Sequence, residues 1–168
     1  LDAATGNDLW RFKTGEDPKI HNQVGIQSSA AVADGIVYFG CRDSNLYAVD
    51  AKTGKEVWRV NNKGSWVIAS PAVSGGIVYA ATSDTGKFFA VDAKTGAERF
   101  ALTFNHWPMF SSPALGGAPA YTGSHMGKRI HNAVRARRVR WAFATYGAKG
   151  NPARHTGAHG TPPQGPAR

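Results

Sequence analysis

The second half of this sequence lacks acidic side chains. Residues 99–168 hold ten lysines and arginines and no aspartate or glutamate, whereas residues 1–98 hold ten basic and eleven acidic residues. The net charge of +9 is therefore carried entirely by the second half. An average over the whole chain hides this asymmetry, so the basic half needs an explanation of its own.

Cysteine and long apolar runs are also scarce. Cys41 is the only cysteine, so an internal disulfide is excluded, and we expect it to be a small buried residue beside Gly40. No apolar run approaches the roughly 20 residues needed to span a bilayer, and the first ten residues lack the pattern of a signal peptide. The chain has no G-x-S-x-G motif, so a serine hydrolase of that type has no support.

Glycine and aromatic residues are abundant. The chain of 168 residues contains 20 glycines, and aromatic residues make up 11% of it. This composition is typical of short strands joined by tight turns, and the chain is long enough to bury a core.

A repeat of about 42 residues dominates the sequence. Three copies align, over residues 28–60, 69–102 and 111–128. Each copy begins with a small, serine-rich segment and continues with a β-branched segment, as in IVYFG and IVYAA. NLYAVD and KFFAVD follow, and then KEVWRV and AERFAL. Alternation and β-branched or aromatic enrichment predict four short strands per copy, which is typical of a propeller blade.

The sequence AKTG, at 51–54 and 93–96, is predicted to form the turn between the third and fourth strands. Its glycine supplies the positive φ that such a turn often requires. We expect Asp50 and Asp92 to cap this turn through hydrogen bonds to backbone N–H groups, with a metal-ligand role as the alternative.

The segments AVDAKTGKEVW (48–58), AVDAKTGAERF (90–100) and LDAATGNDLW (1–10) resemble the pyrroloquinoline-quinone (PQQ) type of β-propeller repeat. The resemblance implies an all-β fold with blades of four antiparallel strands, about three blades plus a leading half-blade. It also implies a structural docking set in which an aromatic residue packs between neighbouring blades. That set is Trp10, Asp50, Gly54, Trp58, Asp92, Gly96, Phe100 and Trp141.

The blades are expected within residues 1–145. Residues 1–15 would end a preceding blade, and three blades would occupy 27–60, 67–102 and 110–145. Residues 146–168 are rich in glycine and proline and are expected to be a disordered tail. Closed propellers have about 4 to 8 blades, so we expect either a fragment of a longer protein or a ring completed by oligomerisation.

The third copy departs from the pattern at RIHNAVRARRVR, residues 129–140. The favoured hypothesis is a local reading-frame error, since loss of all acids with enrichment in Arg, Ala, Pro, Gly and His suits out-of-frame translation of GC-rich DNA. A basic arm for nucleic acid or an acidic surface, and ordinary divergence, are the alternatives. Nucleic acid is not favoured, because nothing in the segment resembles a known binding module.

Strand order brings the loops between blades and the loops after each second strand to one end of the blades. These loops carry a candidate ligand rim of cationic, imidazole and aromatic side chains. Such side chains suit an anionic or planar ligand, or an extended peptide. Blade packing for the tryptophans and a solvated role for the histidines are the alternatives. A metal held by His21, His106 and His125 would lack ligand spacing. The candidate rim is Lys19, His21, Gln23, Arg42, Lys63, Trp66, His106 and Trp107.

Two functions compete. The favoured one is a non-catalytic scaffold or binding module, whose partners are another protein or the missing blades. The alternative is part of a quinoprotein dehydrogenase that oxidises alcohols or sugars with PQQ and Ca²⁺. The adjacent-cysteine pair that some such enzymes place beside the quinone is absent, and Asp43 and Asp84 fit loop-turn roles. A periplasmic or extracellular location is implied by the resemblance alone.

Overall fold

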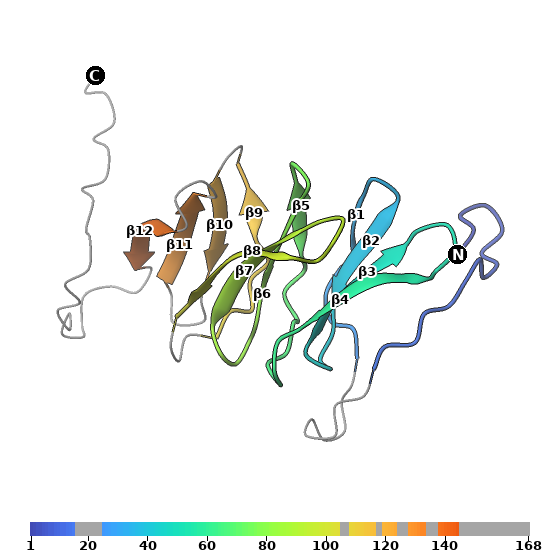
Figure 1. Ribbon diagram of the computed structural model, residues 1–168, viewed down its shortest axis with the longest axis horizontal. Coiled ribbons are helices and arrows are strands. Elements are labelled where there is room, and N and C mark those ends of the chain that lie inside the picture. The colour runs from blue at the N-terminus through green and yellow to red at the C-terminus, as the bar shows by residue number, and fades with distance from the viewer. Residues whose placement is uncertain (16–24, 105–107, 117–118, 124–127, 134–137, 145–168) are drawn as a thin grey trace.

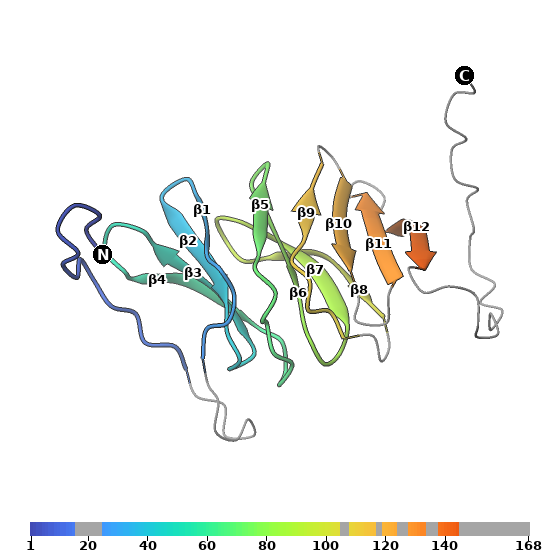
Figure 2. The same cartoon turned by 180° about the vertical axis from the view of Figure 1, so that it is seen from behind.

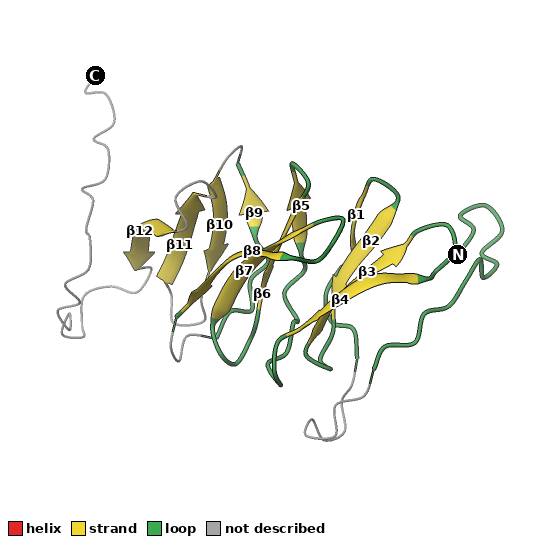
Figure 3. Ribbon diagram, in the orientation of Figure 1, coloured by secondary structure: helices red, strands yellow, loops and turns green. Residues whose placement is uncertain are grey.

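The chain forms strands and loops, with no helix, throughout the residues that the computed structural model describes (Figure 3). Those residues are 1–15, 25–104, 108–116, 119–123, 128–133 and 138–144. Within these ranges, twelve strands form three four-stranded antiparallel sheets, each ordered as in the chain, which confirms the expected fold class. The sheets stand in a row when seen from either side (Figures 1 and 2).

Each sheet is one blade. Blade 1 consists of β1 (Ala31–Ala33), β2 (Ile36–Gly40), β3 (Asn45–Asp50) and β4 (Glu56–Asn61). Blade 2 consists of β5 (Ala72–Ser74), β6 (Ile77–Ala81), β7 (Lys87–Asp92) and β8 (Glu98–Thr103). Blade 3 consists of β9 (Ala114–Leu115), β10 (Pro119–Gly123), β11 (Lys128–Ala133) and β12 (Arg138–Ala144).

A break in register between the third and fourth strands recurs in every blade, next to the aromatic residue of the fourth strand. Ala48 pairs with Trp58, Ala90 with Phe100, and His131 with Trp141, and the register shifts immediately after each pair. A bulge of this kind re-aims the side chains of its strand. The three aromatic positions are therefore equivalent in register.

Hydrophobic packing lies between the blades rather than within a single centre. Blades 1 and 2 share one apolar cluster, blades 2 and 3 share a second, and the leading segment (residues 1–15) covers the other face of blade 1. Cys41 is fully buried in this last cluster, as expected from the sequence. The described residues of the leading segment form turns and loop and no strand.

Blade 3 keeps the strand pairing but not the motif. In its register Ala133 stands where Asp50 and Asp92 stand, so the turn-capping carboxylate is missing. Backbone hydrogen bonds hold the ladder and need no particular side chain, which allows strands where the sequence pattern breaks. Residues 134–137 and the Gly/Pro-rich segment 146–168 lie outside the described residues.

Candidate functional site

Two indole rings join consecutive units of the stack. Trp58 of blade 1 donates a hydrogen bond from Nε1 to the carbonyl oxygen of Ala93 in blade 2, at 3.0 Å. Trp10 of the leading segment makes the same bond to Ala51 of blade 1, at 2.9 Å. Each ring therefore uses its apolar faces for packing and its single polar group for a backbone acceptor in the next blade.

Glycine is required beneath both rings. Gly54 and Gly96 have φ values of 70° and 72°, in the left-handed region. A Cβ atom on Gly54 would lie 2.7 Å from Trp10, and one on Gly96 would lie 2.9 Å from Trp58. The glycine of each turn thus has two roles. It adopts the left-handed backbone conformation, and it leaves room for the indole ring of the preceding unit.

The aspartate before each turn holds the turn together. Asp92 accepts hydrogen bonds from the backbone N–H groups of Lys94 and Thr95 and from Thr95 Oγ1, each at 3.0 Å. Arg99 Nη2 lies 2.6 Å from Asp92 Oδ2, and this partner with the Thr95 bonds lowers the pKa of Asp92 to about 2. Asp50 and Asp2 make the same turn contacts in their own units.

A serine ladder connects the segments that precede the first strands of the three blades. The backbone N–H of Ser29 donates to Ser70 Oγ at 2.8 Å, and the N–H of Ser70 donates to Ser112 Oγ at 3.0 Å. These three serines occupy the same position in successive repeats. The ladder therefore has one direction along the stack, with each blade donating to the next.

Three of the candidate rim residues lie at the same end of blade 1. The loop after β4 meets the loop after β2, since the N–H of Asn62 donates to the carbonyl oxygen of Ser44 at 2.8 Å. The guanidinium carbon of Arg42 lies 3.8 Å from the centre of the Trp66 ring, and both side chains are partly exposed. Lys63 is exposed in the same loop as Trp66. The structure therefore gives this end a cation stacked on an aromatic ring.

The remaining rim candidates are not placed. Lys19, His21, Gln23, His106 and Trp107, together with His125, lie outside the described residues. The proposed convergence of the eight rim residues therefore stays a prediction.

Asp43 and Asp84, near this end, both accept hydrogen bonds that hold loops in place. Asp43 is 2% exposed and accepts hydrogen bonds from Tyr47 Oη at 2.5 Å and from the N–H of Asn45 at 3.0 Å. Asp84 accepts from the N–H of Trp66 at 3.1 Å and from Ser83 Oγ at 2.9 Å. Asp84 thereby fixes the backbone that carries the Trp66 ring.

Burial, followed by the hydrogen bond with Asp43, raises the pKa of Tyr47 to about 12. Gly15 of the leading segment donates its N–H to the same hydroxyl at 3.0 Å. Tyr47 therefore ties the leading segment to blade 1.

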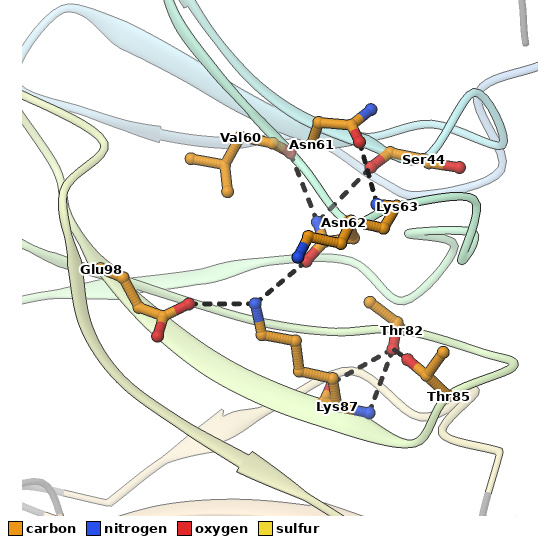
Figure 4. A network of polar contacts seen from close by, with 9 residues as sticks. All are labelled: Ser44, Val60, Asn61, Asn62, Lys63, Thr82, Thr85, Lys87 and Glu98. Carbon is orange, nitrogen blue, oxygen red and sulfur yellow. Dashed lines mark hydrogen bonds and ion pairs between the residues drawn. The ribbon is translucent and has the colours of Figure 1, made fainter.

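Lys87 forms a polar bridge that the sequence did not reveal. Its Nζ atom donates to Asn62 Oδ1 at 3.4 Å in the inter-blade loop and lies 3.0 Å from Glu98 Oε2 in β8 (Figure 4). Lys87 Nζ also lies 4.7 Å from the centre of the Phe89 ring. Lysine, asparagine and glutamate at these spacings carry no motif, so only the fold brings them together.

A cavity among the described residues lies at the other end of the strands from Arg42 and Trp66, beside the AKTG turn of blade 2. It has a volume of about 460 Å³ and combines an apolar wall with two cationic side chains. Its lining is Gly75, Gly76, Ile77, Asp92, Lys94, Arg99 and Phe100. The AKTG turns and the Arg42–Trp66 pair are thus at opposite ends of the strands.

Neither a metal-binding cluster nor a membrane-spanning helix is found in the part of the chain that the structure describes. No group of three His, Cys, Asp or Glu residues there is placed to share a metal ion. No helix there is long and apolar enough to cross a membrane.

Known proteins with related sequence or fold include both enzymes and an assembly factor. A dehydrogenase subunit of quinone alcohol dehydrogenase from Gluconacetobacter polyoxogenes is 43% identical over 68 residues, which is 36% of this chain and 9% of that protein. The chain thus spans less than a tenth of the length of that relative.

Two solved structures share the fold. BamB from Moraxella catarrhalis superposes with a TM-score of 0.61 at 24% identity, over 71% of this chain and 37% of that one. Quinohemoprotein alcohol dehydrogenase ADHIIG from Pseudomonas putida gives a TM-score of 0.64 at 19% identity, over 71% and 26%.

A family model described as outer membrane protein assembly factor BamB matches residues 1–160. With the repeated Asp-turn-Trp docking seen in the structure, this match shows that the chain belongs to that family of PQQ-like β-propeller proteins.

Proposed function

We propose that this chain is a non-catalytic β-propeller binding module within a larger extracytoplasmic protein. The observation that carries the proposal is the Arg42–Trp66 pair, a partly exposed cation over an aromatic ring, beside carboxylates that are engaged in loop hydrogen bonds. Such a surface offers a positive charge that attracts anions and an aromatic face for stacking. Asp43 and Asp84 hold loops through hydrogen bonds, which is a structural role rather than a role in proton transfer.

The chemistry of the pair suits an anionic or planar group. A guanidinium pairs with carboxylates, and the indole plane supplies contact area, so an extended peptide with acidic side chains is the partner we favour. The remaining blades of the same propeller are the second partner, since the chain covers 9% of its dehydrogenase relative. The family description, which names outer membrane protein assembly, supports a periplasmic or extracellular location.

Part of a PQQ-dependent dehydrogenase is the second candidate, and the identity to the quinone alcohol dehydrogenase subunit favours it. The planar, anionic quinone fits the Trp66–Arg42 surface. Calcium takes six to eight oxygen ligands, and the described residues hold no cluster of carboxylates for it. The described residues therefore fit the quinone better than its metal ion.

Titration calorimetry of the purified chain with PQQ, with and without Ca²⁺, separates the two candidates. The variants are Trp66→Ala and Arg42→Gln, and Arg59→Gln is the matched control, because Arg59 lies in the same blade and pairs with Glu56 at 2.9 Å. We expect no calcium-dependent binding of PQQ to a chain whose circular dichroism is native. Calcium-dependent binding that is lost in Trp66→Ala and retained in Arg59→Gln would instead establish the dehydrogenase candidate.

The binding module is tested directly with a short synthetic peptide of alternating Glu and Val, and with its Lys counterpart. We expect the acidic peptide to bind more tightly, and Arg42→Gln to weaken it by about tenfold, the effect of losing one charge-assisted contact of about 1.4 kcal/mol. Equal binding of the two peptides, or equal weakening by Arg59→Gln, would contradict a role for this pair.

A further inference from the structure

The cavity beside the AKTG turn of blade 2 lies at the other end of the strands from the Arg42–Trp66 pair. Its volume is about 460 Å³, within the range of roughly 300–1,000 Å³ that is typical of sites for small molecules. All of its lining residues belong to blade 2, which stands between the other two sheets (Figure 1). The cavity is therefore formed within one blade, by residues that the structure describes.

The repeat allows a direct comparison with the same place in blade 1. The turn between the first and second strands is Asp34–Gly35 in blade 1 and Gly75–Gly76 in blade 2. Asp50 and Asp92 are equivalent, since each pairs with the isoleucine that begins the second strand of its blade. Blade 2 therefore lacks one of the two carboxylates that blade 1 has at this end.

Two further differences act together with this one. Arg99 stands where blade 1 has Val57, and Phe100 stands where blade 1 has Trp58. The lysine of the AKTG turn is present in both blades. The cavity of blade 2 thus has two cations and one carboxylate, whereas the same positions of blade 1 hold one cation and two carboxylates. The sign of the local charge is reversed between the two blades.

The carboxylate of the cavity already has its donors. Asp92 Oδ1 accepts three hydrogen bonds from its own turn, and Asp92 Oδ2 lies 2.6 Å from Arg99 Nη2. A guanidinium has five N–H donors, so this contact leaves Arg99 with donors for a ligand. Lys94 is exposed and forms no ion pair with any residue that the structure describes. An anion in the cavity would therefore meet an available cation and a carboxylate whose charge is compensated.

The turn of two glycines adds open space and backbone donors. The β5–β6 ladder ends at the pair of Ser74 and Ile77, so the N–H groups of Gly75 and Gly76 lie outside it. A Cβ atom on either glycine would meet nothing within 4 Å. Ile77 and Phe100 supply the apolar wall. The cavity thus combines cationic side chains and N–H groups with an apolar surface, which suits an anion that carries an apolar group.

We propose that this cavity binds a small organic carboxylate with an aromatic or branched apolar body. The carboxylate contacts Lys94 and Arg99, and the apolar body lies against Ile77 and Phe100. Charge-assisted hydrogen bonds hold the carboxylate, and removal of the apolar body from water adds affinity. The site is separate from the proposed binding surface, because the two lie at opposite ends of the strands.

The test is an NMR titration of the ¹⁵N-labelled chain with phenylacetate, and with phenylacetamide as its neutral counterpart. We expect the amide signals of Gly75 and Gly76 to shift saturably with phenylacetate, with a Kd on the order of 1 mM for a ligand of about ten heavy atoms. The Gly35 signal is the internal control, because Gly35 lies in the equivalent turn of blade 1. Absence of saturable shifts, equal shifts at Gly35, or equal affinity for phenylacetamide would overturn the proposal.

The charge reversal is tested by Gly75→Asp, which carries the residue of blade 1 into the cavity, with Gly75→Asn as the matched neutral variant. Both chains should fold, because Asp34 has a φ of 50° at the equivalent position and both residue types tolerate the left-handed region. Followed at the Gly76 signal, we expect Gly75→Asp to weaken phenylacetate binding about tenfold, and Gly75→Asn by less than about threefold. Equal weakening by the two variants would overturn the assignment.

One further variant distinguishes this site from the proposed function. Arg42→Gln should leave phenylacetate binding at Gly76 unchanged, because Arg42 lies at the other end of the strands. Loss of acidic-peptide binding with phenylacetate binding retained would count against the proposed function alone. A parallel loss of phenylacetate binding in Arg42→Gln would contradict the placement of the carboxylate in this cavity.

Discussion

The indole of Trp58 lies directly on Gly96 of the following blade, where an added Cβ would be 2.9 Å from the ring. In the repeat, a Gly and a Trp stand four residues apart, as do Gly54 and Trp58. The contact, however, joins the Trp of one repeat to the Gly of the next. The motif therefore encodes packing between repeats, which explains why it marks the fold more clearly than an activity.

The first prediction separates this contact from backbone strain. Gly96 and Gly76 both have φ of 72°, but a Cβ on Gly76 meets nothing within 4 Å. We expect Gly76→Ala to lower the free energy of unfolding by about 1–2 kcal/mol, the cost of a left-handed non-glycine residue. Gly96→Ala should cost a further ~1–3 kcal/mol for overpacking against Trp58. Urea denaturation measures both, and equal losses would argue against the ring contact.

The second prediction concerns acid stability. Arg99, followed by the Thr95 hydrogen bonds, lowers the pKa of Asp92 from 3.8 to about 2. Because the folded pKa lies below the unfolded one, this carboxylate stabilises the fold fully above about pH 4 and loses that contribution as pH falls towards 2. In Arg99→Gln the pKa of Asp92 should rise towards 3.8, so its contribution to stability should be smaller and its loss should be complete at a higher pH. Carboxyl NMR titration of both chains checks this, and an unchanged Asp92 titration would contradict it.

The fold could be predicted from the sequence because two nearly complete copies of one motif repeat in it. The positions of Asp50, Gly54 and Trp58 recur in the second copy, with Phe100 in place of the tryptophan, so period and turn chemistry point to the same blade. The strands of blade 3 were harder to foresee between residues 129 and 140. There the ladder depends on backbone pairing that leaves no side-chain signature.

The candidate site could be predicted only in part. Strand order correctly places the loops of Arg42 and Trp66 at one end, because it depends on connectivity alone. The Lys87–Asn62 bridge and the Asp43–Tyr47 bond depend on how blades and loops pack. Such contacts between residues without a motif cannot be derived from spacing in the chain.

The third prediction addresses the link between the leading segment and blade 1. Tyr47→Phe removes a hydroxyl that donates to the buried Asp43 and accepts from Gly15. We expect a loss of about 1–3 kcal/mol, because buried polar groups are left without their partner. Val32→Thr, at a 66% exposed valine of β1, is the control and should change stability by less than about 0.5 kcal/mol.

The pH dependence of Tyr47 gives an independent check. Its folded pKa of about 12 exceeds the ordinary value of 10, so its contribution is complete below pH 10 and is lost as pH rises from 10 to 12. Burial also raises the pKa of Tyr38 and of Tyr79, so absorbance titration should show several late-ionising tyrosines in the native chain and one fewer in Tyr47→Phe. Ionisation of all tyrosines near pH 10 in the folded chain would contradict the Asp43 bond.

The fourth prediction uses a difference between the blades. Ser28 Oγ accepts from the N–H of Gly40 at 2.8 Å and donates to its carbonyl oxygen at 2.9 Å, and Ser111 makes the same pair of bonds to Gly123. Blade 2 has Ala69 and Ala81 at these two positions. The serine and the glycine therefore change together within this chain.

We expect Ser28→Ala alone to cost about 1–3 kcal/mol, because the buried N–H of Gly40 loses its acceptor. Adding Gly40→Ala should not restore stability, since a Cβ there would lie 2.2 Å from the carbonyl oxygen of Val67. Ser74→Ala, at an exposed serine in β5, is the control and should change stability by less than about 0.5 kcal/mol. Urea denaturation of the three chains decides the matter: if Ser28→Ala unfolds at the same midpoint as Ser74→Ala, the serine bonds do not hold the segment before β1 against β2.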